Sequence, residues 1–225
     1  MVPFSLPNVL GSLFTASVQT IALAGGTIVF ATAIGLALAL GSTSGSRALQ
    51  VPIGWFSAGA RAIPDLLVLL FTFYGLTQVG IQLDPLPAAM IALTFTSCAY
   101  YLEIFRSGLL AIPPSQYEAA RALGIPRHRM MARIILPQVV KIIRQPYTSQ
   151  MTIVVKNTAL ASVVAVPEIL AIATRIAIST GRPFEVLFLG SLVFALINSA
   201  LLTLGTLGRR SANATRLRES AVRGR

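Results

Sequence analysis

Three ionisable residues, Arg61, Glu103 and Lys156, lie in or beside long apolar runs of the sequence. An ionisable side chain is costly in lipid, so such groups tend to face a polar cavity or to pair with one another. Two interpretations of Glu103 and Lys156 stay open from the residues alone. Either they face a polar cavity within the membrane, or Glu103 forms an ion pair with Arg106 or with Lys156. For Arg61 and Asp65 the simpler interpretation is an anchor at the membrane interface.

The sequence offers little for covalent or metal chemistry. Cys98 and His128 are the only residues of their types, and they lie in an apolar run and in a basic loop. This separation excludes an intrachain disulfide and gives no metal-ligand spacing. A nucleophile–base constellation at membrane depth is equally poor, and no G-x-x-x-x-G-K-S/T loop is present to bind a nucleotide phosphate. We therefore predict a protein that is not an enzyme, with no metal site and no cofactor on this chain.

The elements that must position these residues are membrane-spanning helices. Apolar residues make up 55% of the 225 residues and charged residues only 11%, whereas soluble proteins carry about 25% charged residues. A spanning helix needs about 20 predominantly apolar residues. The sequence predicts an all-α integral membrane protein with about five spans, near residues 13–40, 53–81, 85–109, 145–167 and 186–208.

The distribution of positive charge predicts the orientation of these spans. The net charge is +11, but the cations lie between apolar runs and in the tail, so we predict no nucleic-acid partner. A cytoplasmic 113–137 loop puts 15 of the 18 lysine and arginine residues on the inner side, as the positive-inside rule requires. The N-terminus would then lie outside and the C-terminus in the cytoplasm. Residues 1–208 would form the transmembrane domain, and 209–225 a basic cytoplasmic tail that contacts anionic lipid headgroups.

The basic loop at 113–137 reads as two short helices joined by a tight turn. Ser115 and Glu118 match a capping box at the start of the first helix. Gly124 is placed to end that helix in a left-handed conformation. Pro126 suits the first turn of the second helix, which we expect to end before Pro137.

One face of the first loop helix is nearly bare, because it carries Ala119, Ala120 and Leu123. Small side chains permit close approach by a partner surface. The residues alone leave two interpretations open at this point: a docking device, or an ordinary cytoplasmic helical loop in which Glu118 is only a cap.

The same residues resemble the EAA loop of ABC-importer permeases. Glu118-Ala119-Ala120, then Gly124, then the Ile-Leu-Pro at 135–137 match its three anchors. Residues 101–106 resemble the Y-x-E-x-x-R stretch of the polar amino acid subgroup, which includes histidine, glutamine, arginine and opine permeases. Residues 156–160 resemble its K-D/N-T-S-L segment, with alanine in place of serine. Residues 60–64 are a weak echo of its F-R-G-T-P, without the Gly-Thr pair.

This resemblance implies the MetI-like fold of type I importer permeases in the bacterial inner membrane. The implied partners are an ABC ATPase dimer that binds ATP, a second permease (a homo- or heterodimer), and a periplasmic solute-binding protein. The solute would be a polar or basic amino acid or an opine. The first loop helix would be the coupling helix that contacts the ATPase, through Ser115, Gln116, Glu118, Ala119, Ala120, Arg121, Leu123, Gly124 and Ile125.

The resemblance also suggests residues of a solute path, in which a zwitterion needs opposite charges. The candidates are Arg61, Glu103, Lys156, Asn157 and Thr158. Asn157 and Thr158 either contact the solute or only hold a helix break that supports a gate. The competing class is a secondary transporter or channel for a small polar solute. That class often shows internal repeats, but five spans do not divide equally and the sequence shows no repeat.

Overall fold

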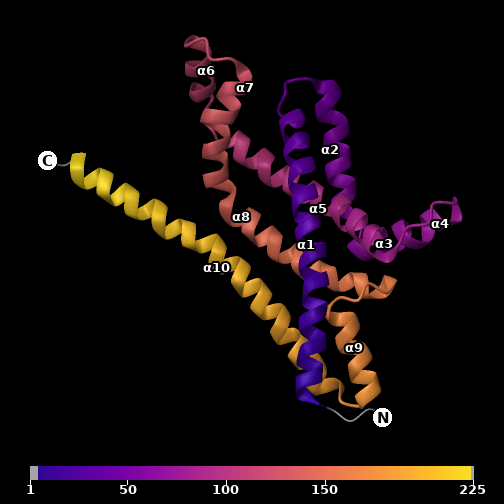
Figure 1. Cartoon of the computed structure of the whole chain (residues 1–225). Helices are drawn as coiled ribbons and strands as arrows, with labels where there is room; N and C mark the ends of the chain where they lie inside the picture. The colour runs from indigo at the N-terminus through magenta and orange to yellow at the C-terminus, as the bar shows by residue number, and fades with distance from the viewer. Residues whose placement is uncertain (1–4, 224–225) are drawn as a thin grey trace.

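The computed structural model describes the backbone of residues 5–223 and the side chains of residues 5–203, and its regular elements are helices (Figure 1). In chain order these are α1 (Leu6–Ser42), α2 (Arg47–Ala62), α3 (Asp65–Leu70), a π-helical turn (Phe71–Gly75), α4 (Leu76–Gln78), α5 (Pro85–Leu110), α6 (Pro114–Ala122), α7 (Arg127–Met130), a second π-helical turn (Met131–Ile135), α8 (Leu136–Asn157), a 3-10 helix (Thr158–Val164), α9 (Ile169–Thr180) and α10 (Pro183–Arg223).

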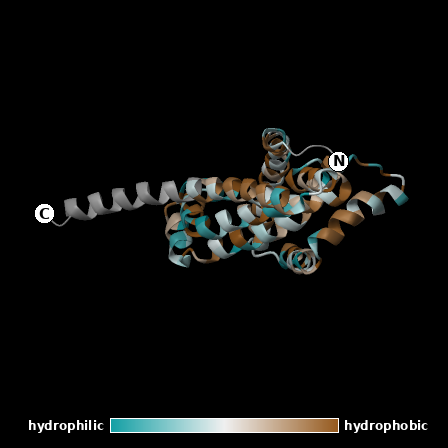
Figure 2. Cartoon of the chain, turned by 90° about the horizontal axis from the view of Figure 1, so that it is seen from below, coloured by the Kyte–Doolittle hydropathy of each residue, from teal (hydrophilic) through white to brown (hydrophobic). Residues whose placement is uncertain are grey.

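Within the described residues, three helices are long and apolar enough to cross a membrane: α1, α5 and the Pro183–Thr203 part of α10. Two bent helix pairs raise the number of candidate spans to as many as five. Hydrophobic residues run along the long helices (Figure 2), and Phe14, Trp55 and Phe184 are 76%, 77% and 80% exposed. Extensive apolar exposure of this kind marks a surface that meets a membrane or another protein. It fits the predicted integral membrane protein.

Helix α1 is the central helix of the bundle, because it contributes to all three buried clusters through Ala39, Leu23 and Leu13. Its closest neighbour is α5, which it crosses in Figure 1. At Gly35 a Cβ atom would lie 2.7 Å from the Cβ of Tyr101 and 2.9 Å from the backbone nitrogen of Leu102. The two backbones therefore approach so closely that only glycine fits, as small residues permit in membrane bundles.

The predicted second span, 53–81, is not one straight helix. Helix α2 ends at Ala62, and the Asp65–Gln78 segment leaves it at an angle of 98°. Ile63 is extended, with ψ 130°, and Pro64 is the N-cap of α3. Proline disfavours helical geometry in the residue before it, so this Ile-Pro pair makes an elbow between the two arms. The elbow lies against α5 through contacts of both α2 and α3.

The second loop helix does not end before Pro137, so that prediction is wrong. Helix α7 continues through the π-helical turn into α8, and the Leu136 amide bonds to the carbonyl of Met131, five residues back. Pro137 lies in the first turn of α8, where the wider turn removes the need for a normal i→i−4 bond from proline.

The fourth predicted span, 145–167, also has different ends. Helix α8 begins well before it and passes at Thr158 directly into the 3-10 helix, so the chain stays helical at Asn157 and Thr158. The break lies later, at residues 165–168. Helix α9, bent by 52° from the preceding segment, is missing from the predicted elements. Helix α10 continues to Arg223 with no break at the predicted end of the last span, and the side chains of the predicted basic tail lie outside the described ones.

Candidate functional site

The first loop helix, α6, ends in a Schellman motif. Gly124 has φ 68°, its amide bonds to the carbonyl of Arg121 at 2.9 Å, and the Ile125 amide bonds to the carbonyl of Ala120 at 3.0 Å. These two bonds satisfy carbonyls that a helix end would leave free, and the left-handed residue between them is normally glycine. The predicted role of Gly124 in ending the helix is confirmed.

The predicted capping box is wrong. Helix α6 begins two residues earlier than predicted, at Pro114, and its N-cap is Pro113, with no side-chain cap hydrogen bond. Ser115 therefore lies inside the first turn. Pro114 fits the first position of the helix because an N–H there would have no partner within the helix, and because the φ of proline already suits a helix. The side chains of Ser115 and Glu118 are left exposed.

Three side chains hold α6 to the rest of the bundle. Ala120 is 3% exposed and belongs to the same buried cluster as Leu109 and Met130, and Tyr117 and Ile125 pack against this cluster. The Tyr117 hydroxyl donates to the carbonyl of Leu109 at 3.2 Å, and burial raises the pKa of this phenol. The 113–137 loop is thereby fixed to the end of α5.

The predicted bare face is consequently divided. Ala120 is buried, so its side chain is not available to a partner. Ile125 is half-buried. The adjoining side of α6, which carries Ala119, is open, and the C-cap residue Leu123 next to it is 78% exposed. The exposed members of the predicted coupling set are Ser115, Gln116, Glu118, Ala119, Arg121, Leu123 and Gly124.

A second candidate site joins α2 to α5 through charge. Glu103 accepts a hydrogen bond from the Ser57 hydroxyl at 2.7 Å, pairs with Arg106 at 3.0 Å and lies 3.6 Å from a guanidinium nitrogen of Arg61. The Arg61 Nε also donates to the carbonyl of Ser57 at 3.1 Å. Of the two ion pairs considered for Glu103, the one with Arg106 is present. Arg61 is a partner of Glu103 rather than an isolated interfacial anchor.

The remaining path candidates separate into different environments. Lys156 is exposed and forms no ion pair with a described residue. Asn157 donates a hydrogen bond to the carboxylate of Asp65 on the far side of the elbow. Thr158 is buried, and its hydroxyl donates to the carbonyl of Val155 at 2.7 Å. Thr158 is therefore held by its own helix.

Sequence reasoning missed Ser57, the Asp65 contact and Glu168. The position of Ser57 one helical turn before Arg61 was a usable signal, since i and i+4 share a face. Glu168 is fully buried, and its carboxylate accepts from the amides of Leu170 and Ala171 at 2.8 and 2.7 Å, which caps α9. No sequence signal distinguished this cap.

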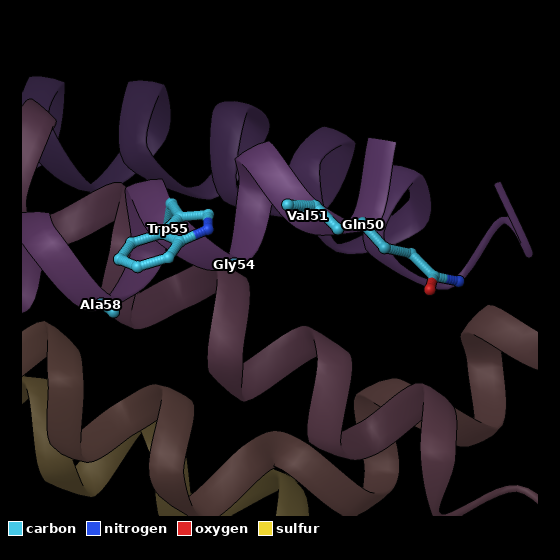
Figure 3. Close-up of a pocket in the computed structure, with 5 residues that line it drawn as sticks. All are labelled: Gln50, Val51, Gly54, Trp55 and Ala58. Atoms are coloured by element: carbon cyan, nitrogen blue, oxygen red, sulfur yellow. The ribbon is translucent and has the colours of Figure 1, made fainter. Parts of the chain in front are cut away.

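A shallow hollow of about 400 Å³ lies on the outward face of α2 (Figure 3). It is lined by Gln50, Val51, Gly54, Trp55 and Ala58. No charged side chain lines it, so it has nothing to hold a zwitterion, and we do not assign the solute path to it. Among the described residues, no group of three His, Cys, Asp or Glu side chains is placed to hold a metal ion.

Most of the chain matches one known protein family. Residues 31–212 match the family model described as binding-protein-dependent transport system inner membrane component. The chain belongs to this family. It is a multi-pass membrane protein and a transport permease subunit of the ABC-importer class, not an enzyme.

Two relatives of this permease match along most of their length. The octopine transport system permease protein OccM of Rhizobium radiobacter is 32% identical over 218 residues, covering 91% of this chain and 89% of the relative. The histidine/lysine/arginine/ornithine transport system permease protein HisM of Escherichia coli K12 is 30% identical over 204 residues, 86% of each chain.

Solved structures agree on the fold. A chain of an amino acid ABC transporter crystallised with histidines superposes with a TM-score of 0.79 at 27% identity, covering 91% of the permease and 94% of that chain. The inward-facing MetNI methionine ABC transporter gives the same TM-score at 19% identity, covering 92% and 99%. The permease therefore has the all-helical MetI-like fold that the loop resemblance implied.

Proposed function

We propose that this permease moves a polar or basic amino acid, or an opine, across the bacterial inner membrane by alternating access. The solute class is supported by the OccM and HisM relatives, whose names specify octopine and basic amino acids. The energy would come from ATP bound on a separate ATPase dimer. A periplasmic binding protein would deliver the solute, and a second permease, identical or different, would complete the pathway.

The proposed topology has five spans, with the N-terminus outside and the C-terminus in the cytoplasm. Counting each bent helix pair as one span gives five. This count puts the 113–137 loop and the tail on the same side, where the excess of lysine and arginine favours the cytoplasm. Arg175 and Arg182 would lie on or near the outer side, and membrane lipid would cover the exposed apolar faces.

The proposed coupling surface is the open side of α6. The observation that carries this proposal is the division of the helix: Tyr117 and Ala120 fix one side to the bundle, while Ala119 and Leu123 leave the other side uncovered. A helix attached in this way moves with the ends of α5 and α8 as a rigid body. Force applied by an ATPase to the open side would then reach the membrane helices directly.

The proposed solute path lies near the elbow between α2 and α3. Helix α5 carries Glu103, which contacts Arg61 before the elbow, and α8 carries Asn157, which contacts Asp65 after it. Both helices also hold the coupling loop. A shift of α5 relative to α8 would therefore change these contacts, and Glu103 and Arg61 offer opposite charges to a zwitterion. Lys156 and Thr158 remain candidates for the same path.

The test is Glu118→Lys, which reverses an exposed charge at the edge of the open side of α6. We expect solute uptake and stimulation of the ATPase to be lost, while the amount of permease in the membrane stays normal. Asp84→Lys is the matched control, because Asp84 is also exposed and also lacks a side-chain cap bond, at the other end of α5. Normal uptake with Glu118→Lys would count against the coupling role.

A further inference from the structure

A hollow of about 990 Å³ lies between the end of α1, the end of α5 and the α6–α7 loop. Its floor is apolar and includes Leu40, Leu109, Ile112 and Met130, and Leu110 at its side is 64% exposed. Leu40 and Leu109 belong to the helices that are most clearly membrane-spanning. The apolar floor therefore lies at the ends of two membrane-spanning helices.

The rim of this hollow is cationic. It carries Arg121, Arg127 and His128 against a single carboxylate, that of Glu118. Neither arginine forms an ion pair with a described carboxylate. The Ser44 hydroxyl oxygen, also at the rim, is buried and has no hydrogen-bond partner. Two guanidinium groups that form no ion pair with a described carboxylate are suited to phosphate oxygens.

We propose that this hollow binds an anionic phospholipid of the inner leaflet, with its phosphate at the arginine rim and an acyl chain along the apolar floor. Basic pockets at the cytoplasmic side of membrane helices bind such headgroups. The proposal goes beyond the transport function and uses only the cytoplasmic placement of the loop. A free phosphate ion would leave the apolar floor unused, which is why the lipid is the better fit.

The ATPase is a poorer occupant because of how α6 is turned. The hollow is lined by Tyr117, Glu118 and Arg121, one side of the helix, and by Ile125 just after it. Ser115, Ala119 and Leu123 do not line it and form the open side. Lipid and ATPase would thus hold α6 from two sides, with Glu118 and Arg121 at the boundary.

The experiment titrates the delipidated importer complex with phosphatidylglycerol or phosphatidylcholine and counts bound lipids by native mass spectrometry. The variant is Arg127→Gln. The matched control is Arg129→Gln, because Arg129 lies in the same helix, is exposed, and does not line the hollow. We expect preference for phosphatidylglycerol, an affinity about fivefold lower in Arg127→Gln, and no change in the control.

Several results would overturn the proposal. These are equal binding of the two lipids, equal effects of Arg127→Gln and Arg129→Gln, or displacement of the lipid by millimolar inorganic phosphate, which would indicate a soluble-anion site. Loss of the ATPase from Arg127→Gln with lipid binding unchanged would instead assign the hollow to the protein interface. Lipid counts do not depend on uptake, so failure of this proposal is distinguishable from failure of the transport proposal.

Discussion

Neighbouring alanines in α6, the proposed coupling helix, should respond in opposite ways when each is replaced by leucine. Ala120 is 3% exposed inside a buried cluster, whereas Ala119 is exposed. Leucine at 120 would add three carbons among packed atoms, because Ala120 does not line the adjacent hollow. Overpacking of this kind costs about 1–3 kcal/mol. Leucine at 119 extends into open space, where a substitution changes stability by about 0.5 kcal/mol at most.

The assay measures two quantities on each purified variant: the melting temperature of the permease, and the amount of ATPase subunit that copurifies. For a chain of about this size, 1 kcal/mol shifts the melting temperature by roughly 2–4 °C. Ala120→Leu should therefore melt about 2–12 °C lower. Ala119→Leu should melt normally but retain less ATPase, because the added side chain keeps a partner from the open side of α6.

The reverse pattern would refute this reasoning. A permease with Ala120→Leu that melts normally and loses the ATPase would mean that Ala120 faces the partner. An Ala119→Leu complex of normal stoichiometry and normal uptake would mean that the ATPase contacts another part of the loop. Either result would require the division of α6 into an attached side and an open side to be abandoned.

Two further predictions concern the bundle. Gly35→Ala should lower the melting temperature, because its Cβ would lie 2.9 Å from a backbone nitrogen of α5, whereas Gly11→Ala, with nothing within 4 Å, should leave it unchanged or slightly higher. A double-mutant cycle with Asp65→Ala and Asn157→Ala, measured by chemical unfolding, should give a coupling energy of about 1.5–3 kcal/mol for this charge-assisted bond; additive effects within error would contradict the contact.

Local sequence signals were sufficient where the structure depends on neighbours in the chain. The apolar runs predicted α1, α5 and the start of α10, and Gly124 predicted the end of α6, because burial in lipid and left-handed backbone are properties of short segments. A prediction from the local sequence was wrong where two helix-start signals lay close together. Ser115 matched a capping box, but Pro113 and Pro114 start the helix first.

The contacts around the elbow could not be predicted in the same way. The Ser57–Glu103 bond joins residues 46 positions apart, and the Asp65–Asn157 bond joins residues 92 apart. From the sequence, Asp65 looked like an anchor beside a proline. After the 98° bend, the start of α3 lies against the 3-10 helix that follows α8, and there Asn157, the last residue of α8, is the partner of the Asp65 carboxylate.

Helix α5 connects the two candidate sites, the 113–137 loop and the elbow. Helix α5 holds the proposed coupling loop through Leu109 and, less than two turns earlier, contacts the α2 side of the elbow through Glu103. Because a helix rises only about 1.5 Å per residue, the two contacts lie close together along α5. If α5 is rigid, a displacement of the loop would therefore displace the elbow by a similar amount. If α5 is this connection, a flexible interruption between the two contacts should uncouple ATP hydrolysis from uptake. Ile104→Gly, at a half-buried position in that interval, should therefore retain ATPase activity and lose uptake; if uptake and hydrolysis fall together, α5 does not act as the rigid link.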